Sequence, residues 1–342
     1  LPLTLGIVDE FRKEGLRIFG PDKNAAKLEG SKAFAKQFMK KYEIPTAEYD
    51  IVTDINDGIK LLKIRKYPLV IKADGLAAGK GVIICQNETE AIDTLTDIMQ
   101  SNIFGDAGNK VVIEEYMEGK EVSLLCFTDS KTIQPMETAS DYKRALDNDE
   151  GLNTGGMGSI SPSPYYTQDI QYLCEEIMQK TLAGIKSESF DYRGVIYIGL
   201  MLTKDGPKVL EYNARFGDPE TEALLPRLES DLVDIIEAIV DKRLSECEIN
   251  WRKEKAVCVV LTSKGYPGEY KVNYPIEIEK AESYVFHAGT TIDDNKLVTS
   301  GGRVIAVTAL ADSFDKARDI VYRDIGKIEF EGKTYRGDIG KL

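Results

Sequence analysis

The sequence contains very little histidine, and this scarcity excludes several kinds of chemistry. His287 is the one histidine among 342 residues, so a zinc site built from several histidines cannot form. A Ser-His-Asp hydrolase would need His287 together with a G-x-S-x-G elbow, and the sequence has no such elbow. A metal in this protein must therefore be held mainly by oxygen ligands, which favours Mg²⁺.

Cysteines in pairs, long apolar stretches and runs of basic residues are also missing. The five cysteines are scattered without C-x-x-C spacing, which is typical of free thiols in a reducing cytoplasm. No apolar stretch reaches the length of a membrane span, so we expect neither a transmembrane helix nor a signal peptide. Lys and Arg number 44 against 57 Asp and Glu, a net charge of −13. We therefore expect a cytoplasmic protein that has neither nucleic acid nor a membrane as a main partner.

Hydrophobic patterning and turn residues predict a mixed protein, α/β or α+β, in four segments. Residues 1–45 contain a predicted helix over 5–13, a strand over 16–19 and a helix from Ser31 to about Lys41. Because a lone strand rarely stands by itself, this segment is interpreted as the remnant of an α/β domain followed by a linker helix. The remaining segments are a small lobe over 46–120, a larger lobe over 121–250 and a mostly β domain over 255–342.

Within the lobes, alternating apolar residues and capping residues predict individual elements. In the small lobe we expect strands at 69–73, 82–85 and 110–115, a helix from Ile55 and a helix over 88–99. In the larger lobe we expect strands at 121–128, 131–138, 194–203 and 208–213, a helix over 167–186 and another near Ser230. One further helix is expected near 312–323.

The most informative segment is a glycine-rich loop between the predicted strands 69–73 and 82–85. It holds Gly75, Gly79 and Gly81 together with Lys80. Glycine lets backbone N–H groups approach an anion closely, and a lysine adds a mobile positive charge. The loop is not a Walker A motif, because no Lys-Ser or Lys-Thr pair is present and a strand follows it instead of a helix. Taken alone, the segment could also be an ordinary glycine-rich hairpin.

A second chemical signal lies on the predicted strand 208–213. Glu211 and Asn213 alternate along it and therefore share a face. Carboxylate and amide oxygens suit Mg²⁺, which takes the rest of its shell from water and nucleotide phosphates. If the strand continues, Arg215 lies on the same side and could bind a phosphate or carboxylate in bidentate fashion. The alternative is a solvated strand face that ends in a turn at 217–219.

The acidic segment 113–121 is predicted to connect two strands. A connector between domains suits an adenine, whose edge bonds backbone groups and whose face packs on apolar side chains. Glu114 or Glu115 could accept a hydrogen bond from the exocyclic amine, and Glu121 could accept from ribose hydroxyls. Each of them alone could equally be a surface acid. The polar segments 140–144 and 153–158 could contact a ligand, or could be a surface charge pair and a plain turn.

The order of these segments along the chain resembles that of the ATP-grasp ligases. Their amino-acid sequences resemble those of the glycinamide ribonucleotide synthetase family (phosphoribosylamine–glycine ligases). The similar motifs are GSKAFAK, IKADGLAAGKGV, NTGGMG, EYNARFGDPET, VFHAGT and TSGGRV, and they cover nearly the whole chain. The resemblance implies an ATP-grasp fold of two α/β lobes plus a mostly β C-terminal domain. It also implies that most of the family's N-terminal domain is missing.

The resemblance implies ATP-dependent ligation of glycine to 5-phosphoribosylamine through glycyl phosphate, a step of purine biosynthesis. ATP and Mg²⁺, or Mn²⁺ in its place, would be required. Two alternatives stay open: a truncated nucleotide-binding fragment without activity, and another ATP-grasp ligase with a different acid or amine.

The same resemblance implies roles for individual residues. The nucleotide ligands would be Lys32, Lys72, Gly75, Gly79, Lys80, Gly81, Glu114, Glu115, Tyr116, Met117 and Glu121, and the metal ligands Glu211 and Asn213. Arg215, Lys80 and Asp218 would be catalytic, and the acceptor substrates would contact Asp141, Lys143, Asn153, Thr154, Gly155, Arg215 and Asp218. His287 is interpreted as a structural or substrate-edge residue in preference to a catalytic base.

Overall fold

The computed structural model describes residues 1–75, 81–101 and 103–342, which form two compact units. The first unit contains residues 1–136, 165–216 and 233–247, and the second contains residues 137–164, 217–232 and 248–342. Because the chain passes back and forth between the units, they do not coincide with the four predicted segments. The boundaries of the two lobes stay a prediction.

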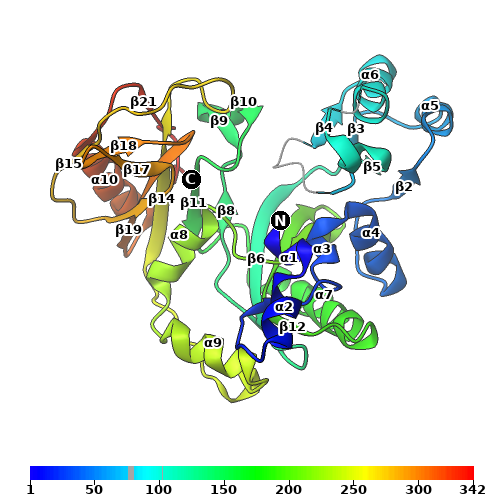
Figure 1. Ribbon diagram of the computed structural model, residues 1–342, viewed down its shortest axis with the longest axis horizontal. Coiled ribbons are helices and arrows are strands. Elements are labelled where there is room, and N and C mark those ends of the chain that lie inside the picture. The colour runs from blue at the N-terminus through cyan, green and yellow to red at the C-terminus, as the bar shows by residue number, and fades with distance from the viewer. Residues whose placement is uncertain (76–80, 102) are drawn as a thin grey trace. The chain divides into compact units, whose positions relative to one another are not determined.

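Within the described residues, the first unit contains a four-stranded antiparallel sheet with the order β2-β5-β3-β4. Its strands are β2 (Tyr49–Val52), β5 (Val111–Glu115), β3 (Leu69–Ala73) and β4 (Val82–Cys85). The helices α5 (Ile55–Leu62) and α6 (Glu88–Met99) pack against each other and on this sheet (Figure 1), and a 3-10 turn, η1, spans Gly105–Asn109. Asn87 caps α6 by accepting a hydrogen bond from the backbone of Glu90 at 3.0 Å, as its position before an apolar run predicts.

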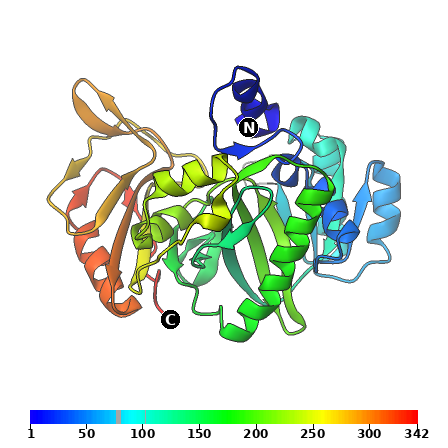
Figure 2. The ribbon, with the colours of Figure 1, turned by 90° about the horizontal axis from the view of Figure 1, so that it is seen from below.

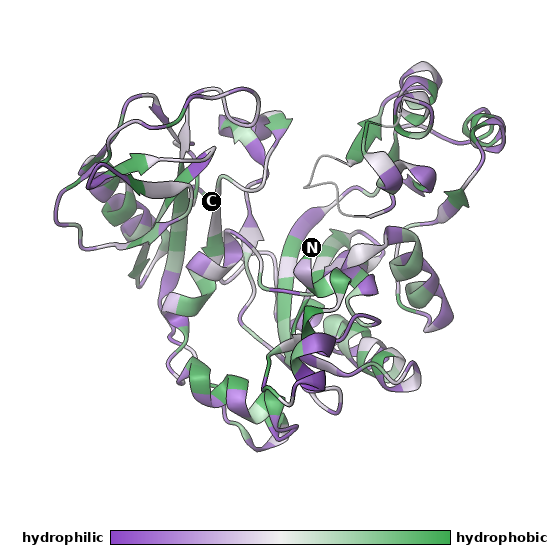
Figure 3. Cartoon of the chain, viewed as in Figure 1, coloured by the Kyte–Doolittle hydropathy of each residue, from purple (hydrophilic) through white to green (hydrophobic). Residues whose placement is uncertain are grey.

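A second antiparallel sheet of the first unit supports the region of the predicted metal ligands. Its strands are β1 (Gly20–Pro21), β12 (Tyr192–Thr203), β6 (Lys120–Thr128), β7 (Ile133–Pro135) and β13 (Gly206–Asn213). The helices α4 (Lys32–Lys41) and α7 (Gln168–Ser187) bury apolar side chains against it, and α7 runs along the sheet (Figure 2). The exposed start of β6 is hydrophilic, whereas its buried remainder is mainly hydrophobic (Figure 3). The other helices of the unit are α1 (Pro2–Leu5), α2 (Ile7–Lys13), α3 (Lys27–Gly30), α9 (Leu232–Val240) and η4 (Leu244–Glu246).

Two predicted strands differ from the observed ones. The prediction of a strand over 16–19 is wrong. In this region only Gly20 and Pro21 form strand pairs, with Arg193 and Tyr192 of β12. The strand expected over 131–138 is shortened to β7, because the Asp129 carboxylate accepts hydrogen bonds from the backbone of residues 131 and 132 at 2.9 and 2.7 Å. A side chain that bonds its own backbone in this way favours a turn.

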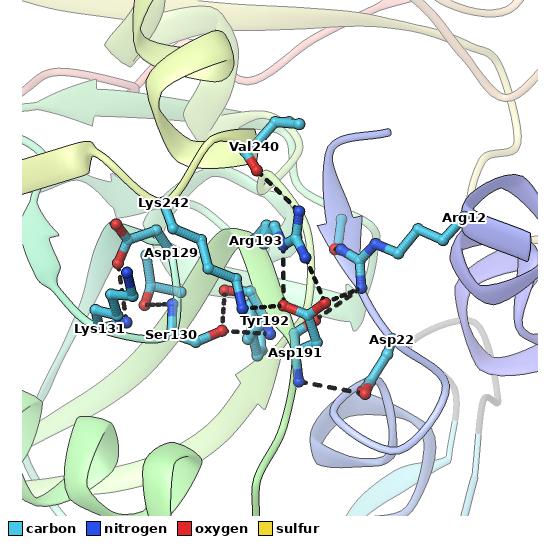
Figure 4. Close-up of polar contacts among 12 residues, drawn as sticks. Arg12, Asp22, Asp129, Ser130, Lys131, Asp191, Tyr192, Arg193, Val240 and Lys242 are labelled. Atoms are coloured by element: carbon cyan, nitrogen blue, oxygen red, sulfur yellow. Dashed lines mark hydrogen bonds and ion pairs between the residues drawn. The ribbon is translucent and has the colours of Figure 1, made fainter. Parts of the chain in front are cut away.

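A charged cluster around Asp191 ties three parts of the first unit together (Figure 4). The carboxylate contacts Arg12 of α2 at 2.9 Å, Arg193 of β12 at 2.7 Å and Lys242, after α9, at 3.0 Å. The Asp191 backbone N–H donates to the carboxylate of Asp22 at 3.2 Å. These contacts hold α2 and the segment after α9 to the start of β12.

The second unit contains a six-stranded antiparallel sheet within the described residues, with the order β16-β19-β14-β11-β8 and β21 beside β14. Its strands are β16 (Tyr284–His287), β19 (Arg303–Ala311), β14 (Lys255–Ser263), β11 (Gly158–Ser161), β8 (Ser140–Asp141) and β21 (Lys333–Thr334). The helix α10 (Phe314–Ile325) packs on β14 and β19. The predicted helix near 312–323 is thereby confirmed.

The smaller elements of the second unit are short ladders and turns. They are β9 (Arg144–Leu146) with β10 (Glu150–Asn153), β15 (Glu277–Ile278) with β20 (Ile328–Glu329), β17 (Thr290–Asp293) with β18 (Lys296–Thr299), α8 (Glu220–Leu224), η2 (Asp147–Asp149) and η3 (Leu225–Arg227). No helix in the described ranges has both the length and the apolar character needed to cross a bilayer.

Candidate functional site

The described start of the glycine-rich segment lies against the N-terminus of α4. Ser31 caps this helix by accepting a hydrogen bond from the backbone of Phe34 at 3.1 Å, and its hydroxyl donates to Asp74 at 2.9 Å. Lys32 Nζ donates to the Gly75 carbonyl at 2.8 Å. Two predicted nucleotide ligands are therefore in direct contact, although 43 positions separate them in sequence.

The other described end of this segment is also fixed. The Ala73 backbone N–H donates to the Gly81 carbonyl at 2.9 Å, which continues the pairing of β3 with β4. Gly75 has a φ of +106°, a conformation that favours glycine. The predicted ligands Gly79 and Lys80 lie outside the described residues.

Two lysines share one oxygen of a buried carboxylate where the small sheet meets α4. Lys72 Nζ of β3 lies 2.9 Å from Glu114 Oε2 of β5, and Lys36 Nζ of α4 lies 3.2 Å from the same oxygen. All three side chains are at most 7% exposed. The other oxygen, Glu114 Oε1, is buried and has no hydrogen-bond partner among the described residues.

Burial shifts the pKa of two lysines at this site, Lys36 and Lys32. Burial lowers the pKa of Lys36 to about 8, a shift that the charge of Glu114 opposes and that of Lys72 reinforces. Burial also lowers the pKa of Lys32, and the negative charge of Glu211 opposes that shift. An ammonium group removed from water prefers an anionic neighbour, so this region favours the binding of an anion.

The connector after β5 combines a charged start with an apolar centre. Glu115 accepts hydrogen bonds from Lys208 Nζ at 3.2 Å and from the Glu48 backbone at 3.1 Å. Tyr116 is 40% exposed, whereas Met117 is 7% exposed. The predicted ribose ligand Glu121 pairs with Met201 at the exposed start of β6. Met117 packs in an apolar group that consists of Ala47, Met117, Leu210 and Met201. Apolar side chains of this kind are what we expect to contact the face of an adenine.

A β-bulge in β13 lies next to the predicted metal ligands. Leu200 of β12 pairs with Val209 whereas Gly199 pairs with Glu211, so Leu210 is an extra residue in β13. Its carbonyl accepts a hydrogen bond from Lys72 Nζ at 3.4 Å. Bulges re-aim neighbouring groups, and this one connects the predicted nucleotide ligand Lys72 with the strand that carries Glu211.

Glu211 and Asn213 are half-buried and alternate with the buried Tyr212, as predicted for two residues on one face of a strand. Arg215 was expected on the same side as Glu211 and Asn213 if the strand continued to it, but β13 ends at Asn213. Arg215 is exposed, and its Nε donates to Glu29 Oε1 at 3.0 Å. Among the described residues no group of three or more His, Cys, Asp or Glu could hold a metal. A metal here would have two protein ligands and would need phosphate or water for the rest of its shell.

The second unit brings several of the predicted acceptor ligands together. Arg303 forms a bidentate ion pair with Asp218, in which Nη1 lies 2.8 Å from Oδ1 and Nη2 lies 3.0 Å from Oδ2. Its Nη1 also donates to the Gly155 carbonyl at 2.8 Å. A Cβ on Gly155 would lie 2.9 Å from the Arg303 guanidinium carbon, so a larger residue at this position would force the Arg303 side chain to shift. Thr154 donates through its hydroxyl to the Lys143 carbonyl at 2.8 Å.

The remaining predicted acceptor ligands are placed on nearby strands of the same unit. Asp141 pairs with Ser159 in the main sheet, and Asn153 is exposed and pairs with Arg144 in the hairpin β9–β10. His287 is exposed and contacts the Thr290 hydroxyl at 3.2 Å.

Three residues of these clusters were missed by the sequence reasoning. Lys36 belongs to the GSKAFAK motif and Arg303 to the TSGGRV motif, but neither motif indicates which side chain reaches a carboxylate. Glu29 carries no local signal, since its partners Ala214 and Arg215 lie 185 and 186 positions away. Only the tertiary structure reveals such contacts.

The sequence matches two domains of one family. Residues 30–221 match the ATP-grasp (A) domain of phosphoribosylglycinamide synthetase, and residues 256–342 match its C domain. The chain belongs to the phosphoribosylglycinamide synthetase family. The family resemblance seen in the sequence motifs is thereby confirmed.

Individual relatives of this synthetase family agree with the domain matches. The chain is 52% identical over 342 residues to the phosphoribosylamine–glycine ligase of Caldanaerobacter subterraneus subsp. tengcongensis, covering 99% of this chain and 82% of that protein. It is 48% identical over 347 residues to the trifunctional purine biosynthetic protein adenosine-3 of Gallus gallus, covering 99% of this chain and 35% of the chicken protein.

Solved structures agree with the synthetase fold. The crystal structure of the phosphoribosylamine–glycine ligase from Thermotoga maritima has a TM-score of 0.90 and 38% identity, covering 97% of this chain and 84% of that one. The biotin carboxylase domain of Hydrogenobacter thermophilus 2-oxoglutarate carboxylase, crystallised with MgADP, has a TM-score of 0.72 at 18% identity, covering 95% of this chain and 72% of that one. The second likeness concerns the fold alone, and together the two confirm the predicted mixed fold with an ATP-grasp core.

Proposed function

We propose that this protein catalyses the ATP-dependent ligation of glycine to 5-phosphoribosylamine, giving glycinamide ribonucleotide, ADP and phosphate. The observation that carries the proposal is the match of 99% of the chain to the Caldanaerobacter phosphoribosylamine–glycine ligase at 52% identity. The buried group of Lys36, Lys72 and Glu114 supports it, because surplus positive charge in a buried site suits a polyphosphate.

The reaction proceeds in two steps. A carboxylate oxygen of glycine attacks the γ-phosphorus of ATP, the bond to the bridging oxygen breaks, and glycyl phosphate and ADP form. The amine of 5-phosphoribosylamine then attacks the acyl carbon, loses a proton, and displaces inorganic phosphate. Both steps develop negative charge on oxygen, so positioning and cations matter more than a strong general base. A chain with a single, exposed histidine can perform such chemistry.

The contacts of the first unit support a nucleotide site. Lys32 and Lys72 hold the phosphates or the adenine of the nucleotide from either side. Glu114 Oε1, which has no partner among the described residues, accepts a hydrogen bond from the adenine amine. The apolar group around Met117 packs against the base, while Glu121 binds the ribose. The remaining proposed nucleotide ligands are Gly75, Gly79, Lys80, Gly81, Glu115 and Tyr116, and the glycine-rich segment 75–81 excludes water from the acyl phosphate.

Glu211 and Asn213 fit a hard divalent cation, because both present oxygen atoms on one half-buried strand face. They would hold Mg²⁺ or Mn²⁺, which supplies positive charge beside the phosphates when it is bound. Arg215, two residues further along, is assigned to the transferred phosphoryl group.

The second unit is assigned to the acceptor substrates. Thr154, Gly155 and Asp218 lie around Arg303 and the Lys143 backbone, which supports a polar site for an amino acid or a sugar phosphate. Asp141, Lys143 and Asn153 complete the proposed set. The two lobes are assigned, as predicted, to residues 46–120 and 121–250, and the C-terminal domain to 255–342.

The decisive experiment is to supply ATP, Mg²⁺, glycine and 5-phosphoribosylamine and to measure the release of ADP. ADP release should require both glycine and the amine. Turnover with other acids but not with glycine would assign the protein to a different ATP-grasp ligase. If ADP raises the unfolding temperature of the protein but no ligase turnover is measured, the protein binds nucleotide without activity. The rise should be measurable, because a ligand at 100-fold its dissociation constant stabilises a protein by about 2.7 kcal/mol.

A further inference from the structure

We propose that Lys36 is a positioning residue for nucleotide binding: by sharing one oxygen of Glu114 with Lys72, it leaves a positive charge for the phosphates and leaves the second oxygen for another group of the ligand. The inference rests on the proposed function, because it concerns the same nucleotide site. It assigns a role to a residue that does not belong to the nucleotide ligands predicted from the sequence.

The geometry fixes the Lys36 ammonium group from two directions. Its Nζ donates to the hydroxyl of Thr46 at 2.7 Å, and that hydroxyl donates to the Val209 carbonyl of β13 at 2.6 Å. The same Nζ lies 3.2 Å from Glu114 Oε2. Lys36 thus connects α4, β13 and β5, and its side chain is 2% exposed. A residue held in this way sets the position of the Glu114 carboxylate.

The charge balance of the cluster is the second argument. Lys36 and Lys72 carry two positive charges against the single negative charge of Glu114, and all three are buried. A buried structural ion pair needs one lysine for one carboxylate, because unpaired buried charge is costly. The surplus positive charge is explained if an anionic ligand completes the cluster.

The unpartnered oxygen of Glu114 is the third argument. Both lysines contact Oε2, so Oε1 remains buried without a hydrogen-bond donor among the described residues. An unsatisfied buried carboxylate oxygen is costly unless a ligand donor reaches it. If Lys36 were removed, the Glu114 carboxylate would be paired with Lys72 alone, and that pair would carry no net charge for a phosphate.

The inference also predicts a pH dependence. The groups that face Lys36 are Glu114 and Glu115 of β5, Lys72 of β3 and the Tyr49 ring of β2, whose centre lies 5.9 Å from Nζ. Burial raises the pKa of Tyr49, so this residue stays neutral while Lys36 titrates. Burial lowers the pKa of Lys36 to about 8. ADP affinity should therefore fall as the pH rises through 8.

The test compares ADP with adenosine, because only ADP carries the phosphates. Isothermal titration with Mg²⁺ should show about tenfold weaker ADP binding for Lys36→Met at pH 7, and a smaller loss of adenosine binding, because adenosine lacks the phosphates. Lys40→Met, an exposed position on the same helix, is the matched control and should bind both ligands like the wild type. Glu114→Gln in the Lys36→Met background should restore the preference for ADP over adenosine, because Lys72 is then released from a carboxylate.

The outcomes separate the inference from the proposed function. Unchanged ADP binding by Lys36→Met, or an equal loss of ADP and adenosine binding, would overturn the positioning role. The wild-type pH profile needs no variant, and an ADP affinity that stays constant from pH 7 to 9 would also overturn it. A wild-type protein that binds no ADP at all would instead refute the proposed nucleotide site.

Discussion

Replacing Asp191 by asparagine should destabilise the first unit by about 2 kcal/mol at pH 7. The carboxylate contacts Arg12 at 2.9 Å, Arg193 at 2.7 Å and Lys242 at 3.0 Å (Figure 4). These three cations come from α2, β12 and the segment after α9. Asparagine has the same shape but no charge, so it leaves the three cations without their common partner.

The magnitude follows from the pKa of Asp191. Burial by itself would raise this pKa, but hydrogen bonds from Arg193 and Lys242 and the charge of Arg12 lower it from 3.8 to about 2. At about 1.36 kcal/mol for each unit of pKa, the difference of about 1.8 corresponds to about 2.4 kcal/mol. Because folding depresses the pKa, the stabilisation is complete well above pH 4 and is lost as the pH falls towards 2. About 1.3 kcal/mol should remain at pH 3.

Urea unfolding at pH 7 and pH 3, followed by circular dichroism, measures this effect. The difference in unfolding free energy between wild type and Asp191→Asn should shrink by about half between the two pH values. Asp205→Asn, at the exposed turn between β12 and β13, is the control and should stay within about 0.5 kcal/mol of wild type. A difference that is equal at both pH values, or absent at pH 7, would refute the electrostatic explanation.

Three further predictions concern the site and the second unit. Glu211→Gln should keep the unfolding temperature, because the volume is conserved, and should raise the Mg²⁺ concentration for half-maximal ADP release about tenfold; an unchanged Mg²⁺ dependence would remove Glu211 from the site. Lys80→Ala should lower turnover about 100-fold, with a change in unfolding free energy below about 1 kcal/mol; a large loss of stability would indicate a structural loop instead. Gly156→Ala should destabilise the second unit by about 1 kcal/mol or more, because Gly156 has a φ of +117° and a Cβ there would lie 2.3 Å from Pro219; thermal unfolding like that of the wild type would contradict this.

Features that depend on neighbouring residues were predicted well. Ser31 before an apolar run and Asn87 three positions before Glu90 mark helix starts, and both residues cap a helix in the structure. The alternation of Glu211 and Asn213 around Tyr212 is likewise a local property of a strand. Such signals act within one turn or one strand, so the sequence contains all the information they need.

Features that depend on distant pairing were not predicted. The strand expected at 16–19 lies instead at Gly20 and Pro21, because β12 supplies backbone partners only there. The strand β13 ends at Asn213, and Arg215 is bound by Glu29, a residue 186 positions away. Local propensity does not contain such information, since the partner's position is decided by how the whole chain folds.

By itself, the sequence determined the family, the mixed fold and the types of residue available for chemistry. A loop with Gly75 and Gly81, two predicted oxygen ligands on one strand and a single histidine favour chemistry on phosphate with a hard cation. The tertiary structure alone decided that Lys36 and Lys72 share one oxygen of Glu114, and that the other oxygen has no partner among the described residues. The physical reason is that a buried charge is defined by its surroundings, and those surroundings come from α4, β3 and β5, which are separate in sequence.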